Sequence, residues 1–72
     1  MNNTFSKKLR YEREAVCKLT VRQMADKLSI PVETYRNYES DGIRHREPDF
    51  NMLLKIATVL EVSTDYLLGL EN

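Results

Sequence analysis

The stretch MADKLSIPVETYRNYE, residues 24–39, contains two short helical patterns separated by only three residues, Ser-Ile-Pro. The apolar side chains that define the patterns are Met24, Ala25 and Leu28 in the first and Tyr35 and Tyr38 in the second. A helix that stops after about two turns and restarts almost at once sets its two halves at a steep angle. The second helix is therefore expected to stand away from the rest of the molecule, with one face open to a partner.

Length and composition limit the remaining possibilities. The chain has 72 residues, 42% hydrophobic and 31% charged, which predicts one folded domain over residues 1–72. No apolar run reaches the roughly 18–20 residues of a membrane span, and the start MNNTFSKK lacks the apolar block of a signal peptide. We expect a cytoplasmic protein without a membrane partner. Cys17, the single cysteine, is expected to be a small core residue at a helix end.

Charge is distributed unevenly although the net charge is zero. Residues 1–46 contain ten Lys and Arg against six Asp and Glu, a net charge of +4. Residues 47–72 contain one Lys against five acids, a net charge of −4. A basic face of this kind can attract a polyanion while the acidic end points away from it. The alternative is a random scatter of charge over a small surface.

Five helices and no strand are predicted, which gives a compact all-α domain. Their expected ranges are 4–17, 20–28, 31 or 32 to 39 or 40, 50–60, and a short helix after Ser63 that ends at Gly69. Thr20 and Gln23 form a capping-box pattern, and Asp49 and Ser63 have the N-cap residue types. Gly42, in the loop SDGIRHREP, can adopt positive φ.

The chain also repeats itself. The residues concerned are Ala25, Leu28, Ile30, Pro31 and Tyr35, echoed by Ala57, Leu60, Val62, Ser63 and Tyr66. Each copy reads as helix, three-residue turn, helix. The second copy lies in the acidic half and the first contains Arg22, Lys27 and Arg36, so if either copy contacts a polyanion such as DNA, it is expected to be the first.

The first copy has the spacing of a helix-turn-helix over residues 20–39. Counted from Val21, apolar residues fall at the fourth, eighth, tenth, fifteenth and eighteenth places, with a small residue at the fifth, Ala25, where the helices cross. The segments LTVRQMADKLSIPVETYRNYE and LLKIATVLEVSTDYLLG resemble the DNA-binding domain of the phage repressor and Cro family, also called Xre-type or lambda-repressor-like. The resemblance runs from about Phe5 to Gly69.

The resemblance implies a five-helix fold and sequence-specific binding of double-stranded DNA by a transcriptional regulator, a repressor that reads the major groove with its third helix.

Four departures from the family pattern stand out. Val21 replaces a phosphate-contacting Gln, and Ser29 replaces a turn glycine. The loop between Glu39 and Pro48 is a few residues longer than usual, and the joint AVCK is one residue longer.

The third helix separates into two sides at about 100° per residue. Pro31, Tyr35 and Tyr38 share one side, and the opposite side carries Val32, Glu33, Arg36 and Asn37. By resemblance, Val32, Glu33 and Asn37 occupy the base-reading places, with Arg36 beside them. Asn can pair with adenine, Arg with guanine or a phosphate, Glu with cytosine, and Val with a thymine methyl group. The alternative is an ordinary solvated helix face.

Phosphate contacts are expected at three places. The start of the second helix offers backbone N–H groups and side chains at Thr20, Val21 and Arg22. The loop offers Arg44, His45 and Arg46, which could also be merely solvated, and the resemblance adds the backbone at Phe50. The family also often joins an Arg of the first helix to the Glu that ends the third, here Glu39 with Arg10 or Arg13. Such an ion pair would fix the angle of the reading helix.

Two other classes of function are an enzyme and a protein-binding module. One His, one Cys and no glycine-rich phosphate loop or metal-ligand spacing argue against an enzyme, a metal site, a cofactor or a small-molecule ligand. An antitoxin-like module of the same fold that binds a protein is favoured by the zero net charge, Val21 and Glu33.

One such module reads only a few base pairs, so a homodimer on a near-palindromic operator is expected. Leu67 is expected to lie in the core. Leu68, Leu70 and the surface of the fifth helix are candidates for the dimer surface, and the alternative is that these leucines close the core.

Overall fold

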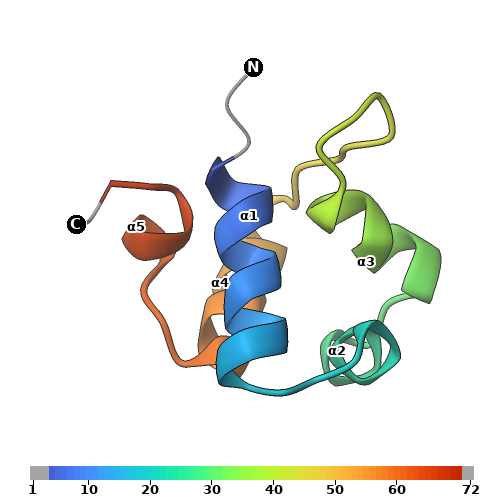
Figure 1. Ribbon diagram of the computed structural model, residues 1–72, viewed down its shortest axis with the longest axis horizontal. Coiled ribbons are helices and arrows are strands. Elements are labelled where there is room, and N and C mark those ends of the chain that lie inside the picture. The colour runs from blue at the N-terminus through green and yellow to red at the C-terminus, as the bar shows by residue number, and fades with distance from the viewer. Residues whose placement is uncertain (1–3, 71–72) are drawn as a thin grey trace.

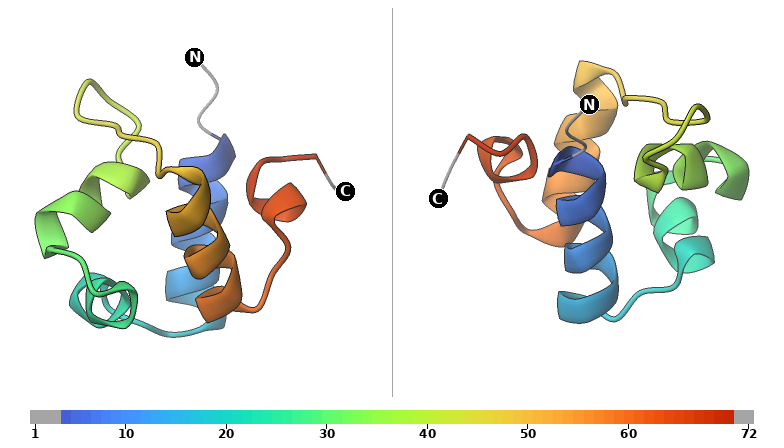
Figure 2. Two further views of the ribbon diagram at one scale, coloured as in Figure 1. Left: turned by 180° about the vertical axis from the view of Figure 1, so that it is seen from behind. Right: turned by 45° about the horizontal axis from the view of Figure 1, so that its top comes forward.

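Helix α1 (Thr4–Tyr11) runs through the middle of the molecule, and the other helices are arranged around it (Figure 1). The computed structural model describes residues 4–70, and over that range every regular element is helical. The elements that follow are η1 (Glu12–Val16), α2 (Val21–Leu28), α3 (Val32–Glu39), α4 (Phe50–Leu60) and α5 (Thr64–Leu67). The rear view shows α4 in front of α1, with α2 and α3 on one side and α5 on the other (Figure 2). The predicted all-α fold is confirmed.

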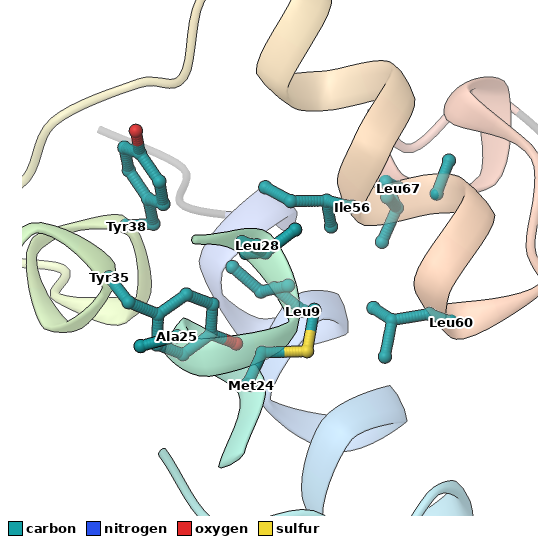
Figure 3. Packing of buried hydrophobic residues seen from close by; sticks show 10 residues of the cluster. Leu9, Met24, Ala25, Leu28, Tyr35, Tyr38, Ile56, Leu60 and Leu67 are labelled. Carbon is teal, nitrogen blue, oxygen red and sulfur yellow. The ribbon is translucent and has the colours of Figure 1, made fainter. Parts of the chain in front are cut away.

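The core forms where all five α-helices meet. Its fully buried side chains include Leu9 of α1, Met24 of α2, Tyr35 of α3, Ile56 of α4 and Leu67 of α5 (Figure 3). Each helix is amphipathic, so burying one apolar stripe per helix produces a single shared core. Leu67 therefore lies in the core as expected, and Leu53 packs partly buried against it.

The first helix changes its geometry earlier than the sequence predicts. After Tyr11 the chain continues as the π-helix η1, where the N–H of Cys17 donates to the Glu12 carbonyl, five residues back, at 2.9 Å. A π turn holds more residues than an α turn, so η1 rotates the residues that follow relative to those of α1. Val16 is consequently 53% exposed, and the predicted single helix over residues 4–17 is wrong, since the α-helix ends at Tyr11.

The two copies of the internal repeat have the same backbone geometry. The C-cap residue of α2 is Ser29 (φ 59°, ψ 43°), and the C-cap residue of α4 is Glu61 (φ 58°, ψ 43°). In each copy the next N–H donates five residues back, from Ile30 to Ala25 at 3.1 Å and from Val62 to Ala57 at 3.0 Å. These are Schellman endings, which turn the chain sharply with a left-handed residue. Three residues then lead to the next helix in both copies, as predicted.

The long loop between α3 and α4 has no residue with left-handed backbone. Among the described residues, positive φ occurs at Lys18, Ser29, Glu61 and Gly69 but not at Gly42, so the expectation for Gly42 is wrong. The loop folds back through side-chain and backbone hydrogen bonds instead of a left-handed glycine. Over residues 4–70, none of the helices has the length and apolar character needed to cross a membrane.

Candidate nucleic-acid interface

Helix α3 buries one side and exposes the other. Tyr35 is 0% exposed and Tyr38 is 8% exposed, and their rings meet edge to face with centroids 6.2 Å apart. On the opposite side the Glu33 side chain is 76% exposed and that of Arg36 is 62% exposed. Asn37 is half-buried beside them. Polar side chains that can reach base edges therefore project from a helix held by two aromatic rings.

The beginning of α3 departs from the predicted division of faces. Pro31 is exposed although it was placed with the tyrosines, whereas Val32 is half-buried and packs against the core. Pro31 is the N-cap, and its extended backbone (φ −62°, ψ 148°) does not follow helical periodicity. Val32 is the first helical residue and faces the neighbouring helices. The outward group is therefore reduced to Glu33, Arg36 and Asn37, with only part of Val32 accessible.

The C-terminal end of α3 is fixed by a buried network around Glu39. Arg13 donates to Glu39 through Nε at 2.6 Å and through Nη2 at 3.0 Å, and its Nη1 donates to the Leu19 carbonyl at 2.8 Å. The Tyr35 hydroxyl also donates to Glu39 Oε2, at 2.5 Å. A two-pronged Arg–carboxylate contact fixes both partners in orientation. The network therefore joins η1, the approach to α2 and the reading helix.

The two arginines expected to pair with Glu39 differ in role. Arg13 is 6% exposed and forms the short contacts, whereas Arg10 Nε lies 3.6 Å from Glu39 Oε1 with its side chain 62% exposed. The hydrogen bond to Glu39 raises the pKa of Arg13 above its ordinary value. Burial, followed by the hydrogen bond to Glu39, raises the pKa of Tyr35. Tyr35 therefore stays neutral and can donate to the carboxylate.

The start of α2 is organised by the predicted capping box. The Gln23 N–H donates to Thr20 Oγ1 at 3.0 Å, and the Thr20 N–H donates to Gln23 Oε1 at 2.8 Å. The N–H groups of Val21 and Arg22 lie in the first turn, where an α-helix supplies no carbonyl to receive them. Arg22 is exposed, whereas Val21 is half-buried against the core. Val21 can thus offer a phosphate its backbone N–H.

The loop between α3 and α4 projects beyond the end of α3 (Figure 1) and is fastened to it. The Arg46 N–H donates to the Asn37 carbonyl at 3.0 Å, and His45 Nδ1 lies 2.7 Å from the Ser40 carbonyl. A carbonyl only accepts, so Nδ1 carries the proton in this contact. His45 is half-buried and holds the loop in shape, which reduces its suitability as a phosphate ligand. Arg44 and Arg46 are exposed.

Helix α4 begins with an N-cap, as the sequence predicts. Asp49 Oδ1 accepts from the Met52 N–H at 2.8 Å, and the Asp49 carbonyl accepts from the Leu53 N–H at 2.9 Å. The N–H of Phe50 lies in the first turn of the helix, like that of Val21 in α2. The Phe50 side chain is 71% exposed.

Two residues that position the interface were missed by sequence reasoning. Ser6 of α1 donates through Oγ to the Tyr38 carbonyl at 2.8 Å, which ties α1 to the end of α3. Lys55 of α4 donates through Nζ to the Leu28 carbonyl at 3.2 Å, at the end of α2. Both contacts end on backbone carbonyls more than 25 positions away, so no local sequence pattern could reveal them. Over residues 4–70, no group of three or more His, Cys, Asp and Glu side chains could hold a metal ion.

The chain is similar in sequence to several known proteins. The chain is 47% identical over 55 residues to the uncharacterized HTH-type transcriptional regulator YqaE of Bacillus subtilis, covering 76% of this chain and 45% of that protein. It is 41% identical over 63 residues to the cryptic phage CTXphi transcriptional repressor RstR of Vibrio cholerae, covering 86% and 52%. It is 36% identical over 68 residues to the uncharacterized HTH-type transcriptional regulator YobD of Bacillus subtilis, covering 94% and 57%.

The chain spans about half the length of the curated relatives it matches. No solved structure matches it significantly. The profile of the helix-turn-helix family matches residues 9–67, which include the two helices, the turn between them and the buried network that holds α3. The chain therefore belongs to the helix-turn-helix family.

Proposed function

We propose that residues 1–72 form one DNA-binding unit of a sequence-specific transcriptional regulator, a repressor, and that α3 reads the major groove. The observation that carries this proposal is the exposed group Glu33, Arg36 and Asn37 on a helix fixed from behind by Tyr35, Tyr38 and Glu39. Bases are discriminated by side chains held in place, and phosphate contacts set the register of the protein on the duplex. The regulators and the repressor among the relatives support the same role.

The proposed phosphate contacts lie at the starts of two helices and on the loop. They are the first turn of α2 at Thr20, Val21 and Arg22, the loop at Arg44 and Arg46, and the first turn of α4 at Phe50. Helix starts bind anions because their N–H groups point outward and the helix dipole is positive there. His45 contributes by shaping the loop. We propose that the chain is not an enzyme. We also propose that it acts in the cytoplasm, where its DNA lies.

We propose that two copies bind a near-palindromic operator. One reading helix contacts only a few base pairs, and half-sites one helical turn apart lie about 34 Å from each other. The longest dimension of the molecule is 29 Å, so two copies fit on consecutive major grooves of one DNA face. Leu68 and Leu70 are 47% and 73% exposed, which makes the end of the chain a candidate dimer surface.

Selection of bound fragments from a random DNA pool at physiological salt tests the proposal directly. We expect a palindromic consensus with two half-sites. An enriched sequence without symmetry would argue against the dimer, and no enrichment at all would argue against base reading by α3.

An antitoxin-like protein-binding module is the second candidate, because Glu33 places an exposed carboxylate on the reading face. The two roles differ in their response to salt. DNA binding releases counterions, so the affinity falls steeply as salt concentration rises. A protein partner bound mainly through apolar contacts would show a shallow salt dependence.

A further inference from the structure

A groove of about 840 Å³ lies between α1 and α3, on the side of the molecule next to the reading helix. Its floor is the buried Arg13–Glu39 pair. Lys7 and Arg10 line it from α1, Arg36 lines it from α3, and its edge reaches the first turn of α2 at Val21. The groove therefore adjoins both the reading helix and the helix start proposed to bind a phosphate.

The exposed charges of this groove are mainly positive. Four cations and three carboxylates line it, and the buried Arg13 is in contact with two of those carboxylates, Glu39 and Glu14. Glu39 balances the charge of Arg13, so the exposed charges that remain are Lys7, Arg10 and Arg36 against the carboxylates of Glu14 and Asp41, a net charge of +1.

The two exposed arginines have only loose carboxylate contacts. Arg10 Nε lies 3.6 Å from Glu39 and Arg36 Nε lies 4.0 Å from Glu33, and both side chains are 62% exposed. A guanidinium has five N–H donors, so each arginine keeps most of its donors for another anion.

We propose that this groove binds the sugar-phosphate backbone of DNA, with Lys7, Arg10 and Arg36 as the phosphate-binding residues. The inference rests on the proposed function and extends the interface from α2 and α3 onto α1. Continuity favours DNA over another anion, because a strand bordering the major groove entered by α3 would pass beside Arg36 and Val21. Lys7 and Arg10 are one helical turn apart on the same face of α1, so they can serve successive phosphates of that strand.

The proposal changes the role of Arg36. A side chain that lines the groove and binds a phosphate adds affinity for every sequence and selects none. Base discrimination then belongs to Glu33 and Asn37.

The adjacent lysines of α1 give a matched test. Lys7 lines the groove, whereas Lys8 Nζ lies 4.4 Å from the centre of the Tyr66 ring, on the side of α1 that faces α5. Lys7→Gln and Lys8→Gln remove the same charge from the same helix. The dissociation constant of each variant for a short mixed-sequence duplex and for the selected operator is measured across a range of salt concentrations. Thermal unfolding shows whether each variant is folded.

We expect Lys7→Gln to raise the dissociation constant roughly fivefold at physiological salt and to make the salt slope shallower by about 0.9, the contribution of one phosphate contact. The loss should be the same for both duplexes, and Lys7→Arg should restore it. Lys8→Gln should leave the slope unchanged. If Lys7→Gln and Lys8→Gln both keep the wild-type slope, the phosphate contact is wrong and the groove is open to another anionic occupant, such as an acidic polypeptide. If wild-type protein shows no salt-dependent DNA binding, the proposed function fails as well.

Discussion

At the scale of single residues, the side chains of α3 divide the work of recognition. Asn37 offers an amide that can pair with adenine from a helix face, whereas Arg46 lies on the loop and is proposed to donate to backbone phosphates. Asn37 is half-buried, and its backbone carbonyl accepts from the Arg46 N–H. Its side chain therefore starts from a defined backbone position. Removing the two side chains should therefore change binding in different ways.

Asn37→Ala is expected to cost about 1–3 kcal/mol of binding free energy on the preferred operator and to relax specificity at one position. Arg46→Ala is expected to weaken binding to all sequences alike and to reduce the salt slope by about one. Competition binding with operators varied at single positions measures both effects. A uniform loss for Asn37→Ala would show that Asn37 does not read a base.

Tyr35 makes stability sensitive to alkaline pH. Burial and the Glu39 carboxylate raise its pKa in the folded state, whereas in the unfolded chain it loses its proton near pH ~10. Its contribution to stability is therefore complete below that pH and is lost as the pH rises further. Tyr38 and Tyr66 contribute in the same direction, because their pKa values are also raised.

Tyr35→Phe should flatten this alkaline loss and should cost about 1.5–3 kcal/mol near neutral pH through the missing hydrogen bond to a charged group. Urea unfolding of both proteins from neutral pH to above pH ~10 provides the comparison. Parallel curves for the two proteins over the alkaline range would contradict the assignment to Tyr35.

At the scale of secondary-structure elements, the turns after α2 and α4 set the direction of the helices that follow them. Ser29 and Glu61 both hold left-handed backbone, the conformation in which a side chain crowds the next carbonyl. Equivalent positions in the two copies of the repeat carry the same strain, so the geometry belongs to the helix-turn-helix architecture. The steep joint that presents α3 is thus made with residues that fit it imperfectly.

Ser29→Gly is expected to stabilise the protein by about 0.5–1 kcal/mol, because glycine has no Cβ to crowd and this gain exceeds its larger unfolded-state entropy. Glu61→Gly should give a similar gain. Asp26→Gly, in the middle of α2, serves as the control and should destabilise by about 0.3 kcal/mol, because glycine is a slightly poorer helix former than aspartate. Thermal melts compare the three, with about 4–8 °C expected per kcal/mol. A lower melting temperature for both turn variants would rule out strain at these positions.

At the scale of the whole molecule, Arg13 connects the parts that must act together on DNA. It contacts Glu39 at the end of α3 and the Leu19 carbonyl just before the cap of α2. The start of α2, proposed to bind a phosphate, and α3, proposed to read bases, are therefore positioned by one side chain. A buried ion pair adds little net stability, but an unpaired buried charge is costly. We therefore expect the network to act mainly by fixing the angle of α3 and only slightly by adding net stability.

Glu39→Ala should destabilise the fold by about 3–5 kcal/mol, since it leaves Arg13 buried without its partner. DNA affinity should also fall when measured well below the melting temperature, because α3 loses its fixed angle. Glu14→Ala is the matched control, since Glu14 also faces Arg13, at 3.7 Å, but its side chain is 70% exposed and the loss should stay within about 1 kcal/mol. Unchanged affinity for folded Glu39→Ala would contradict the geometric role.

The sequence determined the helices, their caps, the repeated turn and the exposed polar face of α3, because periodicity and capping are local properties of the chain. It also identified Glu39 and two candidate arginines. Only the tertiary structure decided that Arg13 forms the short contacts, that Val32 turns towards the core, and that the chain after Tyr11 forms a π-helix with Val16 exposed. These outcomes depend on the packing of segments far apart in the chain, where burial and long-range hydrogen bonds outweigh local preference.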